Sequence, residues 1–155
     1  MQQSAVAYFT NGRIIIAPVS RTMSGDTIAT DPKWFGKSAK KSVVAQSIGD
    51  ALSGSHSGVA DPTPEQWKRQ FIPFQDAAAV KNFKTFMREA RRVDIDRTGN
   101  TVVLTPSDNL GANNGFEPRP DDAKTVTTGH DEAVAAALLV LLGLRPDPAS
   151  TSTEA

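Results

Sequence analysis

Cysteine is absent from this sequence of 155 residues. Its absence excludes disulfide bonds, thiolate catalysis and cysteine-ligated zinc or iron–sulfur sites. The sequence also lacks the glycine-rich motifs that hold nucleotide phosphates, the GxSxG nucleophile elbow and the HExxH zinc motif. The segment 111–115, GANNG, is not followed by a helix that could bind an anion, so we predict a structural loop. No catalytic constellation is recognisable, and we expect no metal and no cofactor.

Long apolar runs are missing too. The longest, Ala133–Leu142, would span about 15 Å as a helix, half of the hydrocarbon core of a bilayer. The first residues, MQQSAVAYFTNGR, contain neither the basic start nor the apolar centre of a secretory signal. We therefore expect a soluble, cytoplasmic protein with no membrane partner.

The two histidines do not indicate a site. His56 lies in the Ser- and Gly-rich segment 53–58, where a general base would be poorly held, so we predict an ordinary loop residue. His130 precedes Asp131 and Glu132 at a predicted helix start, but no third and fourth metal ligand follows at a suitable spacing. The favourable interaction of carboxylates with a helix N-terminus explains this pair more simply.

Hydrophobic patterning predicts one α+β domain over residues 1–145, a small antiparallel or mixed sheet of two hairpins packed with about three helices. The first hairpin turns at Asn11-Gly12, which suits a type I′ turn. Pro18 should end the second strand or place it at an edge. Because Ile14–Ile16 are consecutive, both faces of that strand should be buried.

The second hairpin is predicted from alternating residues 92–96 and from 101–105, and Pro106 should end it. Residues 107–122 are rich in Gly, Asn, Pro and Asp and should form a long loop. The polar segment 146–155 should be a disordered tail. Apolar residues at three- and four-residue spacing predict the helices. These are 40–52, a second from Ala77 or Val80 to Arg91 with Asp76 as its N-cap, and 129–142 with Gly143 as its C-cap.

Charge is unevenly distributed although the formal net charge is zero. Residues 106–155 contain three basic and eight acidic side chains. The second predicted helix places four cations on the face opposite its apolar residues, namely Lys81, Lys84, Arg88 and Arg91. Such a stripe could contact nucleic-acid phosphates. However, it lacks stacking aromatics and has Glu89 beside it, so a solvated helix face is the simpler interpretation.

Three aromatic residues lie in polar or loop-like segments, namely Trp34, Trp67 and Phe116. Aromatics in such segments usually anchor a loop onto the core, and we expect that role here. They are also among the side chains that form hot spots in protein interfaces.

Several short motifs follow one another in a recognisable order. The first is a Gly turn, an apolar strand with a proline and a Ser-Arg-Thr elbow, formed by Gly12, Ile14 to Ile16, Pro18, Ser20, Arg21, Thr22 and Gly25. The later ones are Ala51, Leu52 and Ser55, then Val80, Lys81 and Phe83, then Pro106 and Asn109, then Gly115 and Phe116. In this order, over residues 6–142, the sequence resembles the immunity proteins of contact-dependent growth inhibition in bacteria. It departs from that family in the last helix, where Glu132 is followed by Ala133-Val134-Ala135 rather than by a Leu-Gly pair.

The resemblance implies a cytoplasmic, non-enzymatic protein that binds and neutralises the toxic C-terminal domain of a secreted effector, as a heterodimer. Such toxins are often nucleases, whose clefts are usually basic because they hold phosphates. An acidic inhibitor surface would speed encounter with such a cleft. We therefore predict toxin contacts in the acidic segment, at Asp108, Phe116, Glu117, Asp121 and Asp122. The elbow, with Arg21 held by hydrogen bonds, is expected to be structural.

Two other hypotheses remain open. One is a small nucleic-acid-binding module that uses the basic stripe, and the other is an enzyme with an unrecognised site around Arg21 and His130. Nucleic-acid binding that weakens steeply with salt would favour the first. Rescue of toxin-expressing cells by this chain would favour the immunity function.

Overall fold

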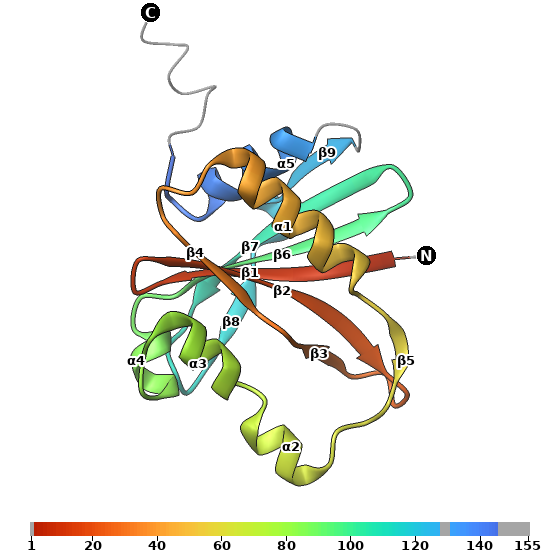
Figure 1. Cartoon of the computed structure of the whole chain (residues 1–155), viewed down its shortest axis with the longest axis vertical. Helices are drawn as coiled ribbons and strands as arrows, with labels where there is room; N and C mark the ends of the chain where they lie inside the picture. The colour runs from red at the N-terminus through yellow and green to blue at the C-terminus, as the bar shows by residue number, and fades with distance from the viewer. Residues whose placement is uncertain (1, 128–130, 146–155) are drawn as a thin grey trace, which may run out of the picture.

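The computed structural model describes residues 2–127 and 131–145. Within these ranges the chain forms one nine-stranded sheet with helices packed on both faces, which confirms the α+β class (Figure 1). The predicted tail 146–155 and His130 lie outside the described residues. The sheet order is β3-β2-β1-β6-β7-β8, with β4 and β5 also paired to β2 and β9 also paired to β7.

Two long hairpins form the centre of the sheet. They consist of β1 (Gln2–Thr10) with β2 (Arg13–Thr22), and β6 (Arg91–Thr98) with β7 (Thr101–Asn109). Antiparallel pairing of β1 with β6 joins the two hairpins. Asn11 has φ 51° and Gly12 has φ 74°, the positive values that a type I′ turn requires, so this predicted turn is confirmed.

Short strands extend the sheet on both sides. On the β2 side they are β3 (Thr27–Ala29) and β4 (Lys33–Gly36), both antiparallel to β2, and β5 (Ser57–Val59), which is parallel to it. On the β7 side they are β8 (Phe116–Pro118) and β9 (Lys124–Thr127), with the 3₁₀ turn η1 (Pro120–Asp122) between them. The predicted loop 107–122 was therefore wrong in part, because β7 continues through Pro106 to Asn109 and pairs there with β8.

Pro18 does not end its strand, so the first predicted alternative was wrong. Neither β3 nor β4 has a residue paired with Pro18, which therefore lies at a local edge, as the second alternative predicted. The carbonyl of Pro18 accepts the N–H of Thr30 at 3.2 Å, so the backbone polar groups of Pro18 point away from β1. On that outer side the neighbouring strand is interrupted between β3 and β4. The missing N–H of Pro18 therefore costs no hydrogen bond to β1, and β2 continues to Thr22.

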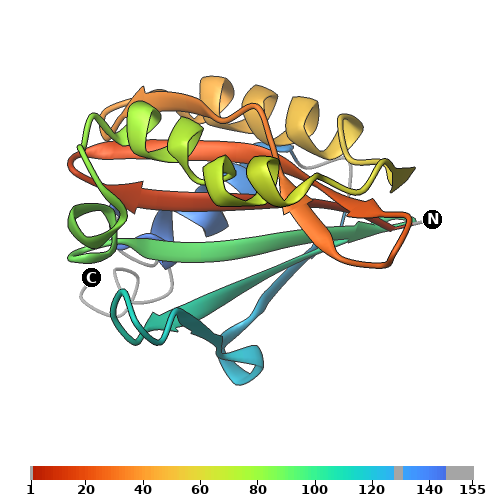
Figure 2. The same cartoon turned by 90° about the horizontal axis from the view of Figure 1, so that it is seen from below.

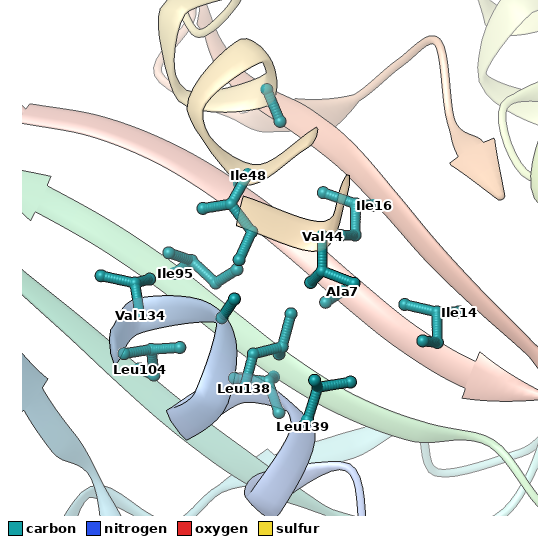
Figure 3. Close-up of a cluster of buried hydrophobic side chains, with 14 of the residues drawn as sticks. Ala7, Ile14, Ile16, Val44, Ile48, Ile95, Leu104, Val134, Leu138 and Leu139 are labelled. Carbon is teal, nitrogen blue, oxygen red and sulfur yellow. The ribbon is translucent and has the colours of Figure 1, made fainter. Parts of the chain in front are cut away.

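One face of the sheet packs against α1 (Lys41–Ser53) and α5 (Asp131–Leu141). Alternate residues of the four long strands meet apolar side chains of both helices (Figure 3). Ile14 and Ile16 lie on this face, while Ile15 lies on the other, and all three are buried, as predicted. Strand alternation thus divides one apolar run between two separate cores.

The opposite face carries an aromatic core under α3 (Ile72–Ala78) and α4 (Phe83–Met87), while α2 (Pro64–Arg69) buries no residue. Tyr8 lies edge-on to Phe74 and Phe86, with ring centroids 5.8 and 5.3 Å apart. These helices cover the β1–β2 half of this face, whereas β7 and β8 lie away from α2 and α3 (Figure 2).

The single helix predicted from Ala77 or Val80 to Arg91 was wrong. Ala79 adopts a left-handed conformation with φ 58° and ends α3. Asn82 then caps α4, since its side chain accepts the N–H of Thr85 at 2.8 Å. Asp76, predicted as an N-cap, lies inside α3. Among the described residues, no helix has the length and apolar character to cross a bilayer.

Candidate functional site

The Ser-Arg-Thr elbow fixes the far end of β2. The Ser20 hydroxyl accepts the N–H of His56 at 3.0 Å, and the Thr22 hydroxyl accepts the N–H of Asp26 at 3.1 Å. The Arg21 guanidinium donates to the carbonyl of Gly25 at 2.9 Å, as expected of a structural arginine. His56 takes part through its backbone, since its carbonyl also accepts the Arg21 N–H at 2.8 Å. The contacts of Arg21 with Gly25 and of Thr22 with Asp26 organise the turn after β2, and the two contacts with His56 join β2 to the segment that begins β5.

Ser55 connects this region to the N-terminal strand. Its hydroxyl donates to the carbonyl of Val19 at 2.6 Å and accepts the N–H of Ser4 at 3.0 Å. The side chain therefore bridges β2 and β1 near the register pair of Ser4 with Val19. Its sequence position indicated only a family motif, and the bridge depends on how α1 ends beside the sheet.

The predicted acidic residues form what we call the acidic edge, comprising Asp108, Glu117, Asp121 and Asp122. Asp108 lies opposite Glu117 in the β7–β8 ladder, and Asp121 and Asp122 follow in η1. All four are exposed. The structure thus brings together four carboxylates that span fifteen positions of the sequence.

Arg119 lies within the acidic edge, and the sequence analysis missed it. Its guanidinium is 3.2 Å from an oxygen of Asp108 and 3.2 Å from an oxygen of Asp122. These ion pairs are about half exposed, so each contributes little to stability. They hold the two carboxylates in place and leave the edge with an excess of three negative charges.

Phe116 does not lie with the acidic edge. It pairs with Asn109 in the β7–β8 ladder, so it points to the opposite face from Glu117. There its ring packs against the aromatic core, 5.9 Å from the Tyr8 ring. Its predicted role as an anchor to the core is confirmed, and this position separates it from the carboxylates it was predicted to assist.

Arg92 lies beside the rings of Tyr8 and Phe116, with its guanidinium carbon 5.8 and 5.7 Å from their centroids. It also donates to Asp94 at 2.9 Å. Burial acts to lower the pKa of Arg92, but Tyr8 and Asp94 outweigh it, so the pKa lies above its ordinary value. Burial raises the pKa of the Tyr8 hydroxyl, partly offset by the Arg92 charge. Arg92 is therefore a fixed cation on the partly open face of the sheet.

The four cations predicted as one helical stripe are distributed over different elements. Lys81 precedes α4, Lys84 lies in it, Arg88 follows it and Arg91 begins β6. Three of them, Lys84, Arg88 and Arg91, nevertheless line one cleft of about 800 Å³. The prediction of one continuous helical stripe was wrong, but the fold brings three of its four cations to the same cleft.

The two tryptophans are more exposed than expected. Trp34 on β4 is 50 % exposed, with the Arg13 guanidinium carbon 3.8 Å from its ring centroid. Trp67 lies on α2 and is 36 % exposed. The prediction that they anchor loops onto the core was therefore wrong for both. Among the residues that the structure describes, no group of three or more His, Asp or Glu side chains could hold a metal ion.

Comparison with known proteins finds similar structures but no similar sequences. No protein-family model matches the sequence, and no curated protein matches it. A protein of unknown function from Neisseria meningitidis, NMB0488, superposes with a TM-score of 0.77 at 14% identity, over 92% of this chain and 94% of that one. A chain of the CdiA-CT/CdiI toxin and immunity complex from Yersinia pseudotuberculosis superposes with a TM-score of 0.77 at 11% identity, over 93% and 97%. At these identities the comparisons establish a shared fold along nearly the whole chain.

Proposed function

We propose that this chain is a cytoplasmic immunity protein that binds the C-terminal toxin domain of a contact-dependent growth inhibition effector and neutralises it. The observation that carries the proposal is the full-length likeness to a chain of a toxin and immunity complex. The order of short motifs in the sequence points to the same family independently. In this role the protein acts by binding and not by catalysis.

The acidic edge is the surface that we propose for the toxin. Its excess negative charge is exposed, and it lies on a β-ladder and a 3₁₀ turn held by ion pairs to Arg119. A nuclease toxin must hold phosphates, so an acidic surface would attract its cleft and raise the association rate. A specific complex would bury about 1,600 Å² in total, so neighbouring residues must contribute apolar contacts. Leu110, which is exposed and directly follows β7, is a candidate for such a contact.

The direct test is neutralisation of the toxin domain encoded beside this chain. Cells that express that domain should survive when they also produce this protein, and the two purified proteins should form a stable complex. Growth arrest despite production of the folded protein would contradict the proposed function.

A charge-reversal variant tests the acidic edge separately. Asp121→Lys with Asp122→Lys should lower the association rate at least tenfold at low ionic strength, and less at high salt, because the effect is electrostatic. The matched control is Asp50→Lys with Asp76→Lys, which makes the same charge change at two exposed helix positions elsewhere. Biolayer interferometry over a range of salt concentrations measures both. Equal rates for the two variants would remove this edge from the interface while leaving the immunity function intact.

A further inference from the structure

A basic cleft lies where α4, the start of β6 and the turn after β7 meet. It has a volume of about 800 Å³ and is lined by Lys84, Arg88 and Arg91. All three side chains are exposed. None of them forms a side-chain hydrogen bond or ion pair with another residue in the described part of the chain. Three cations thus converge on one hollow, and no described residue pairs with their charged groups.

The wall of the basic cleft is held rigidly by Asn109. Its side-chain N–H groups donate to the carbonyls of Met87 at 2.7 Å and Ala90 at 2.8 Å, and its side-chain oxygen accepts the N–H of Gly111 at 2.8 Å. This clamp joins the turn after β7 to the residues that follow α4. It also pairs two backbone carbonyls at and just after the C-terminal end of α4.

The Arg91 guanidinium lies beside the C-terminal end of α5. Its guanidinium lies so close to Gly143 that a Cβ added there would be 2.4 Å from one of its nitrogens. Gly143 follows the end of α5, where unpaired carbonyls favour a cation.

The basic cleft also contains an aromatic ring, which a continuous helix would have placed on the opposite face. Phe83 lines the cleft and is 37 % exposed, while its ring packs edge-on against Phe71 with centroids 4.9 Å apart. Glu89 also lines the cleft, leaving an excess of two positive charges. A positive groove with an exposed aromatic ring is the combination that binds single-stranded nucleic acid.

We propose that the basic cleft binds single-stranded nucleic acid, with phosphates at Lys84, Arg88 and Arg91 and a base against Phe83. The exposed Phe83 ring beside the cations favours a nucleic-acid strand over an acidic polypeptide, because a base can stack on the ring. The site differs from the acidic edge in position and in sign of charge. The proposal therefore does not depend on the immunity function.

The test uses fluorescence anisotropy with a fluorescein-labelled ten-nucleotide polyuridine, and with a labelled ten-residue polyglutamate peptide as the acidic-polypeptide probe. Lys84→Ala with Arg88→Ala should weaken polyuridine binding at least tenfold. It should also lower the slope of log affinity against log salt by about 1.4, since each single-strand phosphate contact contributes about 0.7. Phe83→Leu, which keeps an apolar contact with Phe71, should weaken binding at least fivefold without changing that slope.

The matched control is Lys40→Ala with Lys41→Ala, which removes two exposed cations at the start of α1. It should change affinity less than twofold, and melting temperatures should show that every variant is folded. Absence of polyuridine binding by the wild type would overturn the proposal. Equal loss in the control would also overturn it, because binding would then depend on overall charge. Tighter binding of polyglutamate than of polyuridine would reassign the cleft to an acidic protein segment.

Discussion

The hydrogen bonds of the Ser55 hydroxyl should contribute measurably to the free energy of unfolding. It bridges β1 and β2 through two hydrogen bonds, to the carbonyl of Val19 and from the N–H of Ser4. Ser55→Ala removes both and leaves two partly buried backbone groups without this partner. Each such bond has a net value of about 1 kcal/mol, so we expect a loss of about 2 kcal/mol in the free energy of unfolding.

For a chain of this length, 1 kcal/mol corresponds to about 2–4 °C in melting temperature, so the expected decrease is about 4–8 °C. Urea denaturation gives the free energy, and differential scanning fluorimetry gives the temperature. Amide hydrogen exchange adds a local readout, since the Ser4 N–H should lose protection while amides in the middle of β1 keep theirs.

The matched control is Ser53→Ala, at an exposed position in the last turn of α1. It should change the free energy of unfolding by less than about 0.5 kcal/mol. If Ser55→Ala is no more destabilising than Ser53→Ala, or if exchange of the Ser4 amide is unchanged, the bridge does not stabilise the sheet.

Two further predictions concern backbone geometry and pH. Gly143 has φ 77° and lies against Arg91, so Gly143→Ala should destabilise the protein by about 1–2 kcal/mol in urea denaturation. The control Gly49→Ala should be neutral or stabilising, because Gly49 is helical and a Cβ there would contact nothing within 4 Å. Equal changes in the free energy of unfolding for Gly143→Ala and Gly49→Ala would contradict this reasoning. Burial raises the pKa of Tyr8, so its stabilising contribution is complete below the unfolded pKa of about 10 and is lost as pH rises above it. In urea denaturation, the free energy of unfolding should therefore fall more for wild type than for Tyr8→Phe between about pH 8 and pH 10.5. Equal decreases for the two proteins would contradict a raised pKa of Tyr8 in the folded state.

The hairpins could be predicted because their signals are local. Asn11-Gly12 permits positive φ at both turn positions of the first hairpin. Alternation of apolar and polar residues after Arg91 and after Thr101 indicates the two strands of the second hairpin. The error at Pro18 has a tertiary cause. Whether a missing N–H matters depends on which strand lies beside it, and β3 and β4 come from later in the chain.

The helix error between Ala77 and Arg91 had a local cause that was overlooked. Asn82 is a good N-cap, and it marks the start of α4 more accurately than the spacing of Val80, Phe83 and Met87. That spacing placed Phe83 in the core, whereas Phe86 is the buried residue and Phe83 is partly exposed. Apolar periodicity alone could not separate two short helices from one long helix.

The sequence by itself determined the α+β class, the two hairpins, the burial of Ile14–Ile16 and the concentration of acidic residues after Pro106. These depend on local backbone preference and on side-chain alternation, which act over a few residues. Only the tertiary structure decided that Phe116 faces away from the carboxylates, that Arg119 lies among them, and that Lys84, Arg88 and Arg91 share a cleft. Such relations depend on strand register and on contacts between elements distant in sequence, which no local pattern specifies.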